Sequence, residues 1–239
     1  MAQKRVAIVT GAGSGIGKSA ALTLLKDGWH VGLVGRRKEP LEQAAAESGA
    51  GERALVLPGD ITKDSDVERV FAEVQRAWGR LDVLFNNAGM GAPAMPMEEL
   101  PIEKFREVVE LNLVATFRCT QHAIRIMKAQ SPKGGRIINN GSLSAHVPRA
   151  QSVAYSATKH AISGLTKSIS LDGREHDIAG SQIDIGNAAT ELAKGMSSEP
   201  MMDVNYAGAA VLHMANLPLD VNVQSMAIMA TKMPFIGRG

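Results

Sequence analysis

The fold of this chain is decided by the stretch Thr10-Gly11-Ala12-Gly13-Ser14-Gly15-Ile16-Gly17. A short apolar run precedes it, and a helical apolar pattern begins at Gly15. Glycines at such a junction let the backbone turn tightly and approach a pyrophosphate, which the free N–H groups at the helix start can then bind. No Gly-Lys-Ser/Thr sequence closes the stretch, so it is not a Walker loop. It therefore predicts a dinucleotide-binding loop with contacts from Gly11, Ser14, Gly15, Ile16 and Gly17.

Outward from this loop, short apolar runs alternate with longer stretches of helical periodicity. The predicted strands are Arg5–Thr10, His30–Val34, Ala54–Leu57, Leu81–Phe85, Arg136–Asn139, Ser181–Ile185 and Val221–Met229. The predicted helices are Gly15–Gly28, Pro40–Ser48, Asp64–Trp78, Ile102–Ala129, Ser152–Gly173 and Asp203–Ala215. This alternation predicts an α/β fold, a Rossmann-type doubly wound parallel sheet of seven strands with helices on both faces.

Length and composition agree with a single globular domain over residues 1–239. The chain is 45% hydrophobic and 21% charged, so its 239 residues can bury a sizeable core. A formal net charge of +2 argues against nucleic acid as a partner. We expect a cytoplasmic protein, because no signal-like start and no membrane-length apolar run is present. The lone Cys119 excludes an internal disulfide, and the histidine spacing predicts no metal site.

The sequence Tyr155-Ser156-Ala157-Thr158-Lys159 lies in the predicted helix Ser152–Gly173. A spacing of four puts Tyr155 and Lys159 on one face of the helix, one turn apart. A nearby ammonium group favours the phenolate form of a tyrosine, so the pair could exchange protons near neutral pH. The pair alone is weak evidence, because Tyr and Lys often meet by chance on a solvated helix face.

Three further polar motifs lie near the edge of the predicted sheet where ligands bind in such folds. Ser142 stands thirteen residues before Tyr155, just after a strand. The sequence Asn86-Asn87-Ala88-Gly89 ends the fourth strand, and Asn112 interrupts the long apolar helix. Together with the glycine spacing G-x-x-x-G-x-G, these motifs resemble the short-chain dehydrogenase/reductase family. The resemblance covers most of the chain, from Val6 to about Thr190.

The resemblance implies roles for four residues. Tyr155 would be the general acid or base, and Lys159 would hold the nicotinamide ribose. Ser142 would hydrogen-bond the substrate oxygen, and Asn112 would help to relay protons through water. Ser144 is a competing hydroxyl, but the spacing and the strand end favour Ser142.

The end of the second strand, Gly35-Arg36-Arg37, bears on the choice of nicotinamide cofactor. A carboxylate there would bind a ribose 2′-hydroxyl, whereas Arg36 could pair with a 2′-phosphate. We therefore predict NADP(H) in preference to NAD(H), with contacts from Arg36 and Arg37; the alternative is that both arginines only decorate a solvated turn. By resemblance, the other cofactor contacts are Asp60, Ile61, Asn87, Ala88, Gly89, Tyr155, Lys159, Gly186 and Thr190. The alternative for Asp60 is a cap residue in a loop.

The chain departs from the family pattern in its last third. Ile185 stands where the family often has proline. The C-terminal segment Ala230–Gly239 lacks the Asp-Gly-Gly ending that is common in the family, and the sequence offers no physical explanation for it. Residues 187–202 indicate a loop with a short helix, a candidate substrate lid. His146 could line a substrate pocket, although a solvent-facing loop histidine is the commoner interpretation.

These observations predict an oxidoreductase that transfers a hydride between NADP(H) and a small carbonyl or alcohol substrate. The resemblance also implies a homodimer or homotetramer formed through the helices Ile102–Ala129 and Ser152–Gly173. The alternative from another class is a non-enzymatic sensor of nicotinamide redox state, and the filled catalytic positions argue against it. An epimerase or dehydratase of the extended branch would need a further domain, and only about 50 residues follow the sixth strand.

Overall fold

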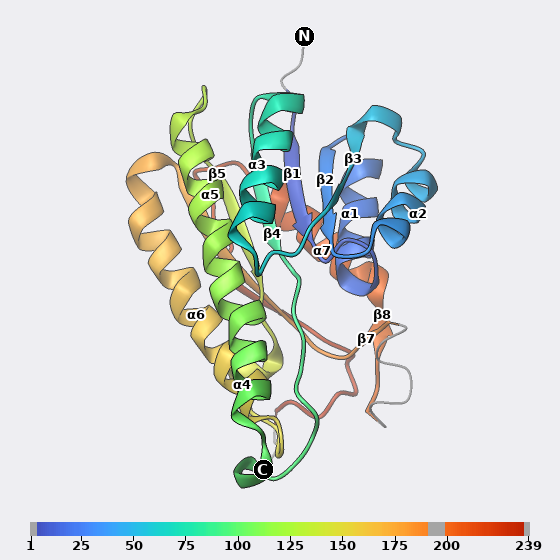
Figure 1. Cartoon of the computed structure of the whole chain (residues 1–239), viewed down its shortest axis with the longest axis vertical. Helices are drawn as coiled ribbons and strands as arrows, with labels where there is room; N and C mark the ends of the chain where they lie inside the picture. The colour runs from blue at the N-terminus through green and yellow to red at the C-terminus, as the bar shows by residue number, and fades with distance from the viewer. Residues whose placement is uncertain (1–3, 191–198, 237–239) are drawn as a thin grey trace.

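The computed structural model of the protein describes residues 4–190 and 199–236, and its centre is a parallel sheet of seven strands (Figure 1). The strands are β1 (Val6–Thr10), β2 (His30–Gly35), β3 (Ala54–Pro58), β4 (Val83–Asn86), β5 (Gly135–Asn140), β6 (Ile178–Ile185) and β9 (Ser225–Ile228). Their order across the sheet is β3-β2-β1-β4-β5-β6-β9. The order reverses between β1 and β4, so the ends of these two strands flank a topological switch point. The predicted fold class is confirmed.

Helices cover both faces of the sheet, as Figure 1 shows. One face carries α1 (Gly15–Lys26), α2 (Lys38–Ser48) and α7 (Val204–Asn216). The other face carries α3 (Asp64–Trp78), α4 (Ile102–Val109), α5 (Ala115–Ala129) and α6 (Val153–Gly173). Short 3-10 turns occur at Gly51–Arg53, Met97–Glu99, Leu143–Ala145 and Arg174–His176.

The hydrophobic core is split into two layers by the sheet itself. In β1, Ala7 and Val9 pack in the layer under α1 and α7, whereas Val6 and Ile8 pack in the layer under α3 and α5. Successive side chains of a strand point to opposite faces, so a strand covered on both faces is apolar at every position. This explains why the strand runs are apolar throughout instead of alternating.

The long helix predicted over Ile102–Ala129 is interrupted. A π-helical turn, Glu110–Val114, separates α4 from α5. A π turn carries an extra residue, which apolar periodicity does not register. The chain is thus helical over the whole predicted range, and the π-helical turn within it is the feature that the sequence did not predict.

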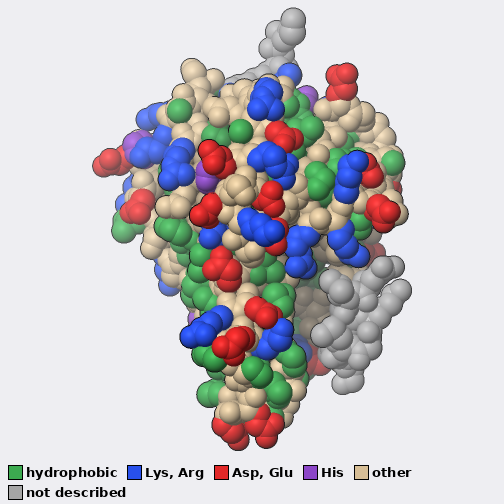
Figure 2. Space-filling model, viewed as in Figure 1, with side chains coloured by type: hydrophobic (Ala, Val, Ile, Leu, Met, Phe, Trp, Pro, Cys, Tyr) green, Lys and Arg blue, Asp and Glu red, His purple; other side chains and the backbone are tan. Residues whose placement is uncertain are grey.

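Beyond β6, two strands of two residues each, β7 (Ala188–Ala189) and β8 (Met202–Asp203), pair in parallel. Residues 191–198 of the predicted substrate lid lie outside the described residues. Among the described residues no helix is long and apolar enough to cross a membrane. Figure 2 shows positive and negative side chains intermixed on one face of the molecule, in line with the small net charge.

Candidate functional site

The glycine loop between β1 and α1 has a backbone that only glycine can adopt comfortably. Gly11 and Gly15 have φ angles of +68° and +53°, in the left-handed region. A Cβ atom on Gly17 would lie 2.2 Å from the carbonyl oxygen of Gly11. The first turn of α1 therefore packs directly on the loop, and its N-terminal N–H groups are available to a phosphate. This cradle fits the pyrophosphate of a dinucleotide.

Hydrogen bonds tie this loop to the ends of the neighbouring strands. The Thr10 hydroxyl accepts from the backbone N–H groups of Asn87 at 2.9 Å and Ala88 at 3.0 Å. The Asn87 amide donates to the Thr10 carbonyl at 2.9 Å and accepts from the Asn140 amide at 3.0 Å. The ends of β1, β4 and β5 are thus fixed relative to one another, and the predicted cofactor contacts Asn87 and Ala88 stand beside the glycine loop.

Tyr155 and Lys159 lie one turn apart on α6. Lys159 is only 6% exposed, and its Nζ donates to the Asn140 carbonyl at 2.6 Å. The same Nζ lies 5.4 Å from the centroid of the Tyr155 ring. The carbonyl of β5 holds the ammonium group at the carboxyl edge of the sheet.

Ser142 follows β5 and caps the 3-10 turn Leu143–Ala145. Its side chain is buried, and its Oγ accepts from the backbone N–H of Ser144 at 3.1 Å. The hydroxyl hydrogen of Ser142 can therefore point elsewhere, toward a substrate oxygen. Ser144, the competing hydroxyl, is equally buried at 8% exposure, so burial does not separate the two serines.

Asn112 sits in the π-helical turn and is 3% exposed. Its side chain exchanges two hydrogen bonds with the backbone of Met90, at 2.8 Å and 2.9 Å, and donates to Thr158 at 3.2 Å. Gly89 lies against it, since a Cβ on Gly89 would be 3.2 Å from the Asn112 Oδ1. In this arrangement the side chain of Asn112 joins the loop after β4 to α6.

The two arginines after β2 are exposed to solvent. Within residues 4–190 and 199–236, neither Arg36 nor Arg37 forms an ion pair. Their guanidinium groups are therefore open to an external anion. The structure is compatible with both sequence-based interpretations, a 2′-phosphate contact and a solvated turn.

Asp60 after β3 forms a local turn. Its Oδ1 accepts from the backbone N–H of Thr62 at 3.1 Å and from the Thr62 hydroxyl at 2.8 Å. The backbone N–H of Asp60 donates to Asp66 at 2.9 Å. This bond, followed by the one from Arg69, holds the pKa of Asp66 below its usual range. One of the two carboxyl oxygens of Asp60 therefore caps this loop, which agrees with the alternative interpretation of Asp60 as a cap residue.

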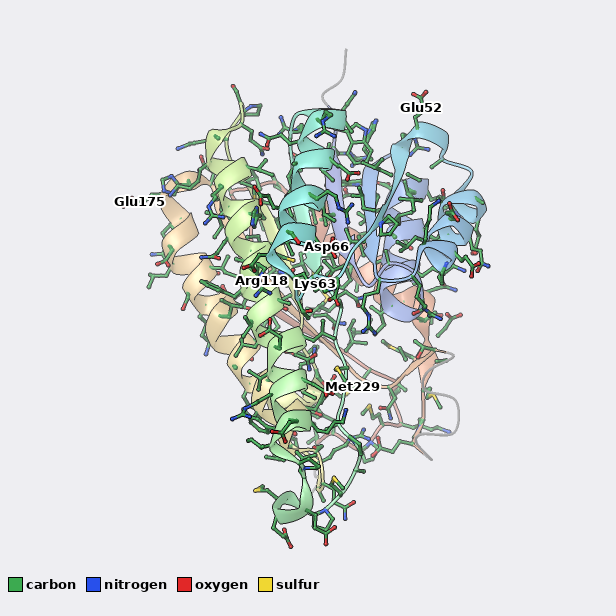
Figure 3. The ribbon with its side chains drawn as sticks, in the orientation of Figure 1. Glu52, Lys63, Asp66, Arg118, Glu175 and Met229 are labelled. Atoms are coloured by element: carbon green, nitrogen blue, oxygen red, sulfur yellow. The ribbon has the colours of Figure 1, made fainter. Side chains whose placement is uncertain are left out.

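Ile61 is buried next to Asp60, and Arg118 of α5 fixes its backbone. The Arg118 guanidinium donates to the Ile61 carbonyl at 3.1 Å and also pairs with Asp64. Figure 3 labels Arg118 beside Lys63 and Asp66 at the start of α3. This ion pair anchors the loop that carries the predicted cofactor contacts Asp60 and Ile61.

The segment after β6 backs onto the last part of the described chain. A Cβ on Gly186 would lie 2.8 Å from both the Met229 Cβ and the Met233 sulfur. Met229, labelled in Figure 3, lies in the lower half of that view. Ile185, in place of the family's proline, pairs with Ile228 of β9, so the ladder holds this segment in place. Thr190 approaches the glycine loop, 3.2 Å from a Cβ on Gly15.

The sequence-based prediction missed Asp184. This residue of β6 is fully buried, and its Oδ1 accepts from the backbone N–H of Ser142 at 2.8 Å. Its other partners are the amide of Gln182 at 2.7 Å, the ring of His146 at 2.9 Å and the hydroxyl of Ser225 at 3.4 Å. One signal was available, because an acidic residue inside an apolar strand needs hydrogen-bond donors around it.

The comparisons with known proteins agree in the class of protein they find. A family model described as short chain dehydrogenase matches residues 5–217. The "Uncharacterized oxidoreductase YxjF" of Bacillus subtilis (strain 168) is 36% identical over 218 residues, which are 91% of this chain and 84% of that protein.

Two solved structures show the same fold with a nicotinamide nucleotide bound. The 3-ketoacyl-(acyl-carrier-protein) reductase from Brucella melitensis, complexed with NADH, has a TM-score of 0.89 at 26% identity, over 96% of this chain and 98% of that chain. The alcohol dehydrogenase from the archaeon Thermococcus sibiricus, complexed with 5-hydroxy-NADP, has a TM-score of 0.85 at 25% identity, over 97% and 98%.

Proposed function

We propose that this protein, which belongs to the short-chain dehydrogenase/reductase family, transfers a hydride between NADP(H) and a carbonyl or alcohol carbon of a small molecule. The observation that carries the proposal is the position of the Lys159 ammonium group. It is held by the Asn140 carbonyl at 2.6 Å and lies 5.4 Å from the Tyr155 ring. An ammonium group fixed in this way can stabilise the negative charge that a tyrosine carries after it has given up its proton.

The nicotinamide supplies the hydride in reduction and accepts it in oxidation. In the reducing direction the Tyr155 hydroxyl gives its proton to the substrate oxygen as the carbonyl carbon becomes tetrahedral. The Ser142 hydroxyl donates a second hydrogen bond to the same oxygen and stabilises its developing negative charge. Lys159 stabilises the phenolate that remains, and in oxidation the same groups act in reverse. Asn112 keeps the π-helical turn in position next to α6.

The acid/base role is tested by Tyr155→Phe, which removes one oxygen atom and leaves the ring. We expect turnover of any accepted alcohol or ketone to fall by at least about 1,000-fold, within the range of losses for an essential acid/base. Cofactor affinity, measured by fluorescence titration, should change little. The chain's only other tyrosine, Tyr206, is exposed on α7, so Tyr206→Phe is a matched control. Retained activity in the Tyr155 variant would refute the mechanism.

The preference for NADP(H) is supported by the exposed arginines that follow β2. A bidentate pair with a 2′-phosphate is a strong, charge-assisted contact. We expect Arg36→Ala to weaken NADPH binding at least about tenfold while leaving NADH binding nearly unchanged. Arg76→Ala on α3, which removes another exposed arginine, is the control. Equal affinities for the two cofactors, unaltered by Arg36→Ala, would remove this part of the proposal.

The proposed partners include a second copy of this chain. The outer faces of the π-helical turn, α5 and α6 expose Val114 at 36%, Phe117 at 48% and Leu171 at 65%. Exposed apolar side chains on long helices favour association of those helices. Light scattering should give a dimer or tetramer, and Phe117→Glu should shift it toward the monomer. A wild-type monomer at working concentration would contradict the proposal.

A further inference from the structure

A buried carboxyl group lies directly behind the turn that carries Ser142. Asp184 has no exposed surface, and a charged group in such a place needs strong hydrogen-bond partners. The Ser142 backbone N–H and the Gln182 amide both donate to its Oδ1, at 2.8 Å and 2.7 Å. These two groups can only donate, so the carboxyl oxygen serves as an acceptor.

The second oxygen of the same carboxyl group holds a histidine. The His146 Nε2 lies 2.9 Å from the Asp184 Oδ2. A Cβ on Gly141 would be 2.0 Å from the Asp184 Oδ1, so the chain has room to pass only because this residue is glycine. One carboxyl group therefore fixes both the backbone of Ser142 and the ring of His146, and it sets the distance between them.

The direction of this contact determines what His146 offers to a ligand. A carboxylate only accepts, so the ring carries its hydrogen on Nε2. With Nε2 facing Asp184, Nδ1 is the ring nitrogen left for a ligand, and no described residue is its hydrogen-bond partner. The side chain is 46% exposed, so a small molecule can reach it.

The last described residues support the histidine from another side. The ring of Phe235 lies 6.4 Å from the His146 ring, edge to face. Met233 precedes Phe235 by two residues in the chain. It is only 7% exposed and packs at Gly186. The segment that the sequence left unexplained thus contacts both the loop after β6 and the ring of His146.

We propose that His146 recognises a hydroxyl group on the carbon next to the reacting one, and that Asp184 is its positioning residue. The substrate class is then a small α-hydroxy ketone or the corresponding vicinal diol. The reacting oxygen would lie on Ser142 and Tyr155, and the adjacent hydroxyl would donate to the Nδ1 of His146. This inference rests on the proposed function, since it places the substrate oxygen on Ser142.

The test compares 3-hydroxy-2-butanone with 2-butanone, which lacks only the hydroxyl, in NADPH oxidation. We expect wild-type kcat/KM to favour the hydroxy ketone at least about tenfold, because a lost hydrogen bond leaves a polar group unpaired. His146→Gln can still reach Asp184 but lacks the Nδ1 acceptor. It should abolish the preference, with kcat/KM for the hydroxy ketone falling much further than kcat/KM for 2-butanone.

Three further variants separate recognition from mere loop structure. His146→Asn places a side-chain oxygen near the former Nδ1 position and should recover part of the preference. Asp184→Asn should lower the preference and kcat together, because it loosens both Ser142 and His146. His213→Gln, on the exposed last turn of α7, should change neither ratio.

Each outcome decides a specific point. A preference that survives His146→Gln overturns the inference, and so does an equal fall for both ketones, since that marks a purely structural role. Wild-type activity without any hydroxyl preference also overturns it, while the proposed function stands. Absence of activity on every ketone and alcohol of a broad panel removes the proposed function itself.

Discussion

The carboxyl ends of the strands form one edge of the sheet and their amino ends form the other, and we call these the carboxyl edge and the amino edge. Polar side chains lie at both edges, but they make different kinds of contact. At the carboxyl edge, Thr10, Asn87 and Asp184 are bonded to backbone groups of neighbouring segments that surround the glycine loop and Ser142. At the amino edge, Arg136 is 1% exposed and donates to carbonyls of the segment that follows α7, among them Val221 at 2.8 Å. The first edge arranges groups around the proposed cofactor and substrate site, and the second joins β5 to the segment that follows α7.

Arg136 shows how a buried charged group can be held by oxygen atoms of the protein itself. Among the described residues it has no carboxylate partner, and its Nε has no hydrogen-bond partner. Burial lowers the pKa of its guanidinium group. Its remaining nitrogens join β5 to residues 217–222, next to a hollow of about 200 Å³. Burial of a charged group therefore does not by itself mark a functional site, and the geometry around it decides.

The largest effect expected from the carboxyl edge is that of Gly17→Ala. The new Cβ would lie 2.2 Å from the Gly11 carbonyl oxygen and 2.4 Å from the Asn87 amide, so the loop must move. We expect cofactor affinity to fall by about 100-fold or more, measured by fluorescence titration. Gly164→Ala is the control, because no atom approaches that position in α6. Its removal of a helix glycine should raise stability by about 0.5–1 kcal/mol. Unchanged cofactor affinity in the Gly17 variant would contradict the proposal that the carboxyl edge binds the cofactor.

The matching change at the amino edge is Arg136→Met. It leaves the carbonyls of residues 217, 218 and 221 without their donor, which we expect to cost about 2–3 kcal/mol of unfolding free energy. Urea denaturation measures this loss. Cofactor affinity of the folded fraction should stay within about twofold. If affinity fell instead, the amino edge would have to be coupled to the site.

A smaller effect concerns pH at the carboxyl edge. Because the pKa of Asp66 is lowered from 3.8 in the folded protein, its contribution to stability is present above pH 3.8. That contribution is lost as the pH falls through the folded value. Asp66→Asn should therefore flatten the fall of the melting temperature below about pH 4, measured by circular dichroism. If the melting temperature fell equally with pH in wild type and variant, the ionised form of Asp66 would contribute no stability.

The smallest expected signal comes from the core between the edges. Burial raises the pKa of the Cys119 thiol to about 12. The thiolate is the reactive form, so iodoacetamide at pH 8 should leave the native protein unmodified. Mass spectrometry after unfolding in urea should find one modified cysteine, in line with the chain's single cysteine. Rapid labelling of the native protein would mean that α5 opens readily.

The sequence predicted the fold well because β1 and its neighbours are buried on both faces and are therefore apolar throughout. It also brought Tyr155 and Lys159 together, since a spacing of four fixes side chains on one helix face. The π-helical turn at Asn112 escaped, because an extra residue in a helix leaves no mark on apolar periodicity. Asp184 and Phe235 escaped for another reason: their contacts join segments far apart in the chain, and only the folded sheet reveals them.

The π-helical turn Glu110–Val114 has a consequence for insertions and deletions. A π turn accommodates one residue more than an ordinary helical turn, so removing one residue there would restore a regular α-helix through Asn112. Asn112 would lose its hydrogen bonds to Met90 and Thr158, and the loop after β4 would no longer be anchored to α6. The number of residues in this turn is therefore part of the geometry of the site. A variant library should keep the chain length there unchanged before it varies any side chain.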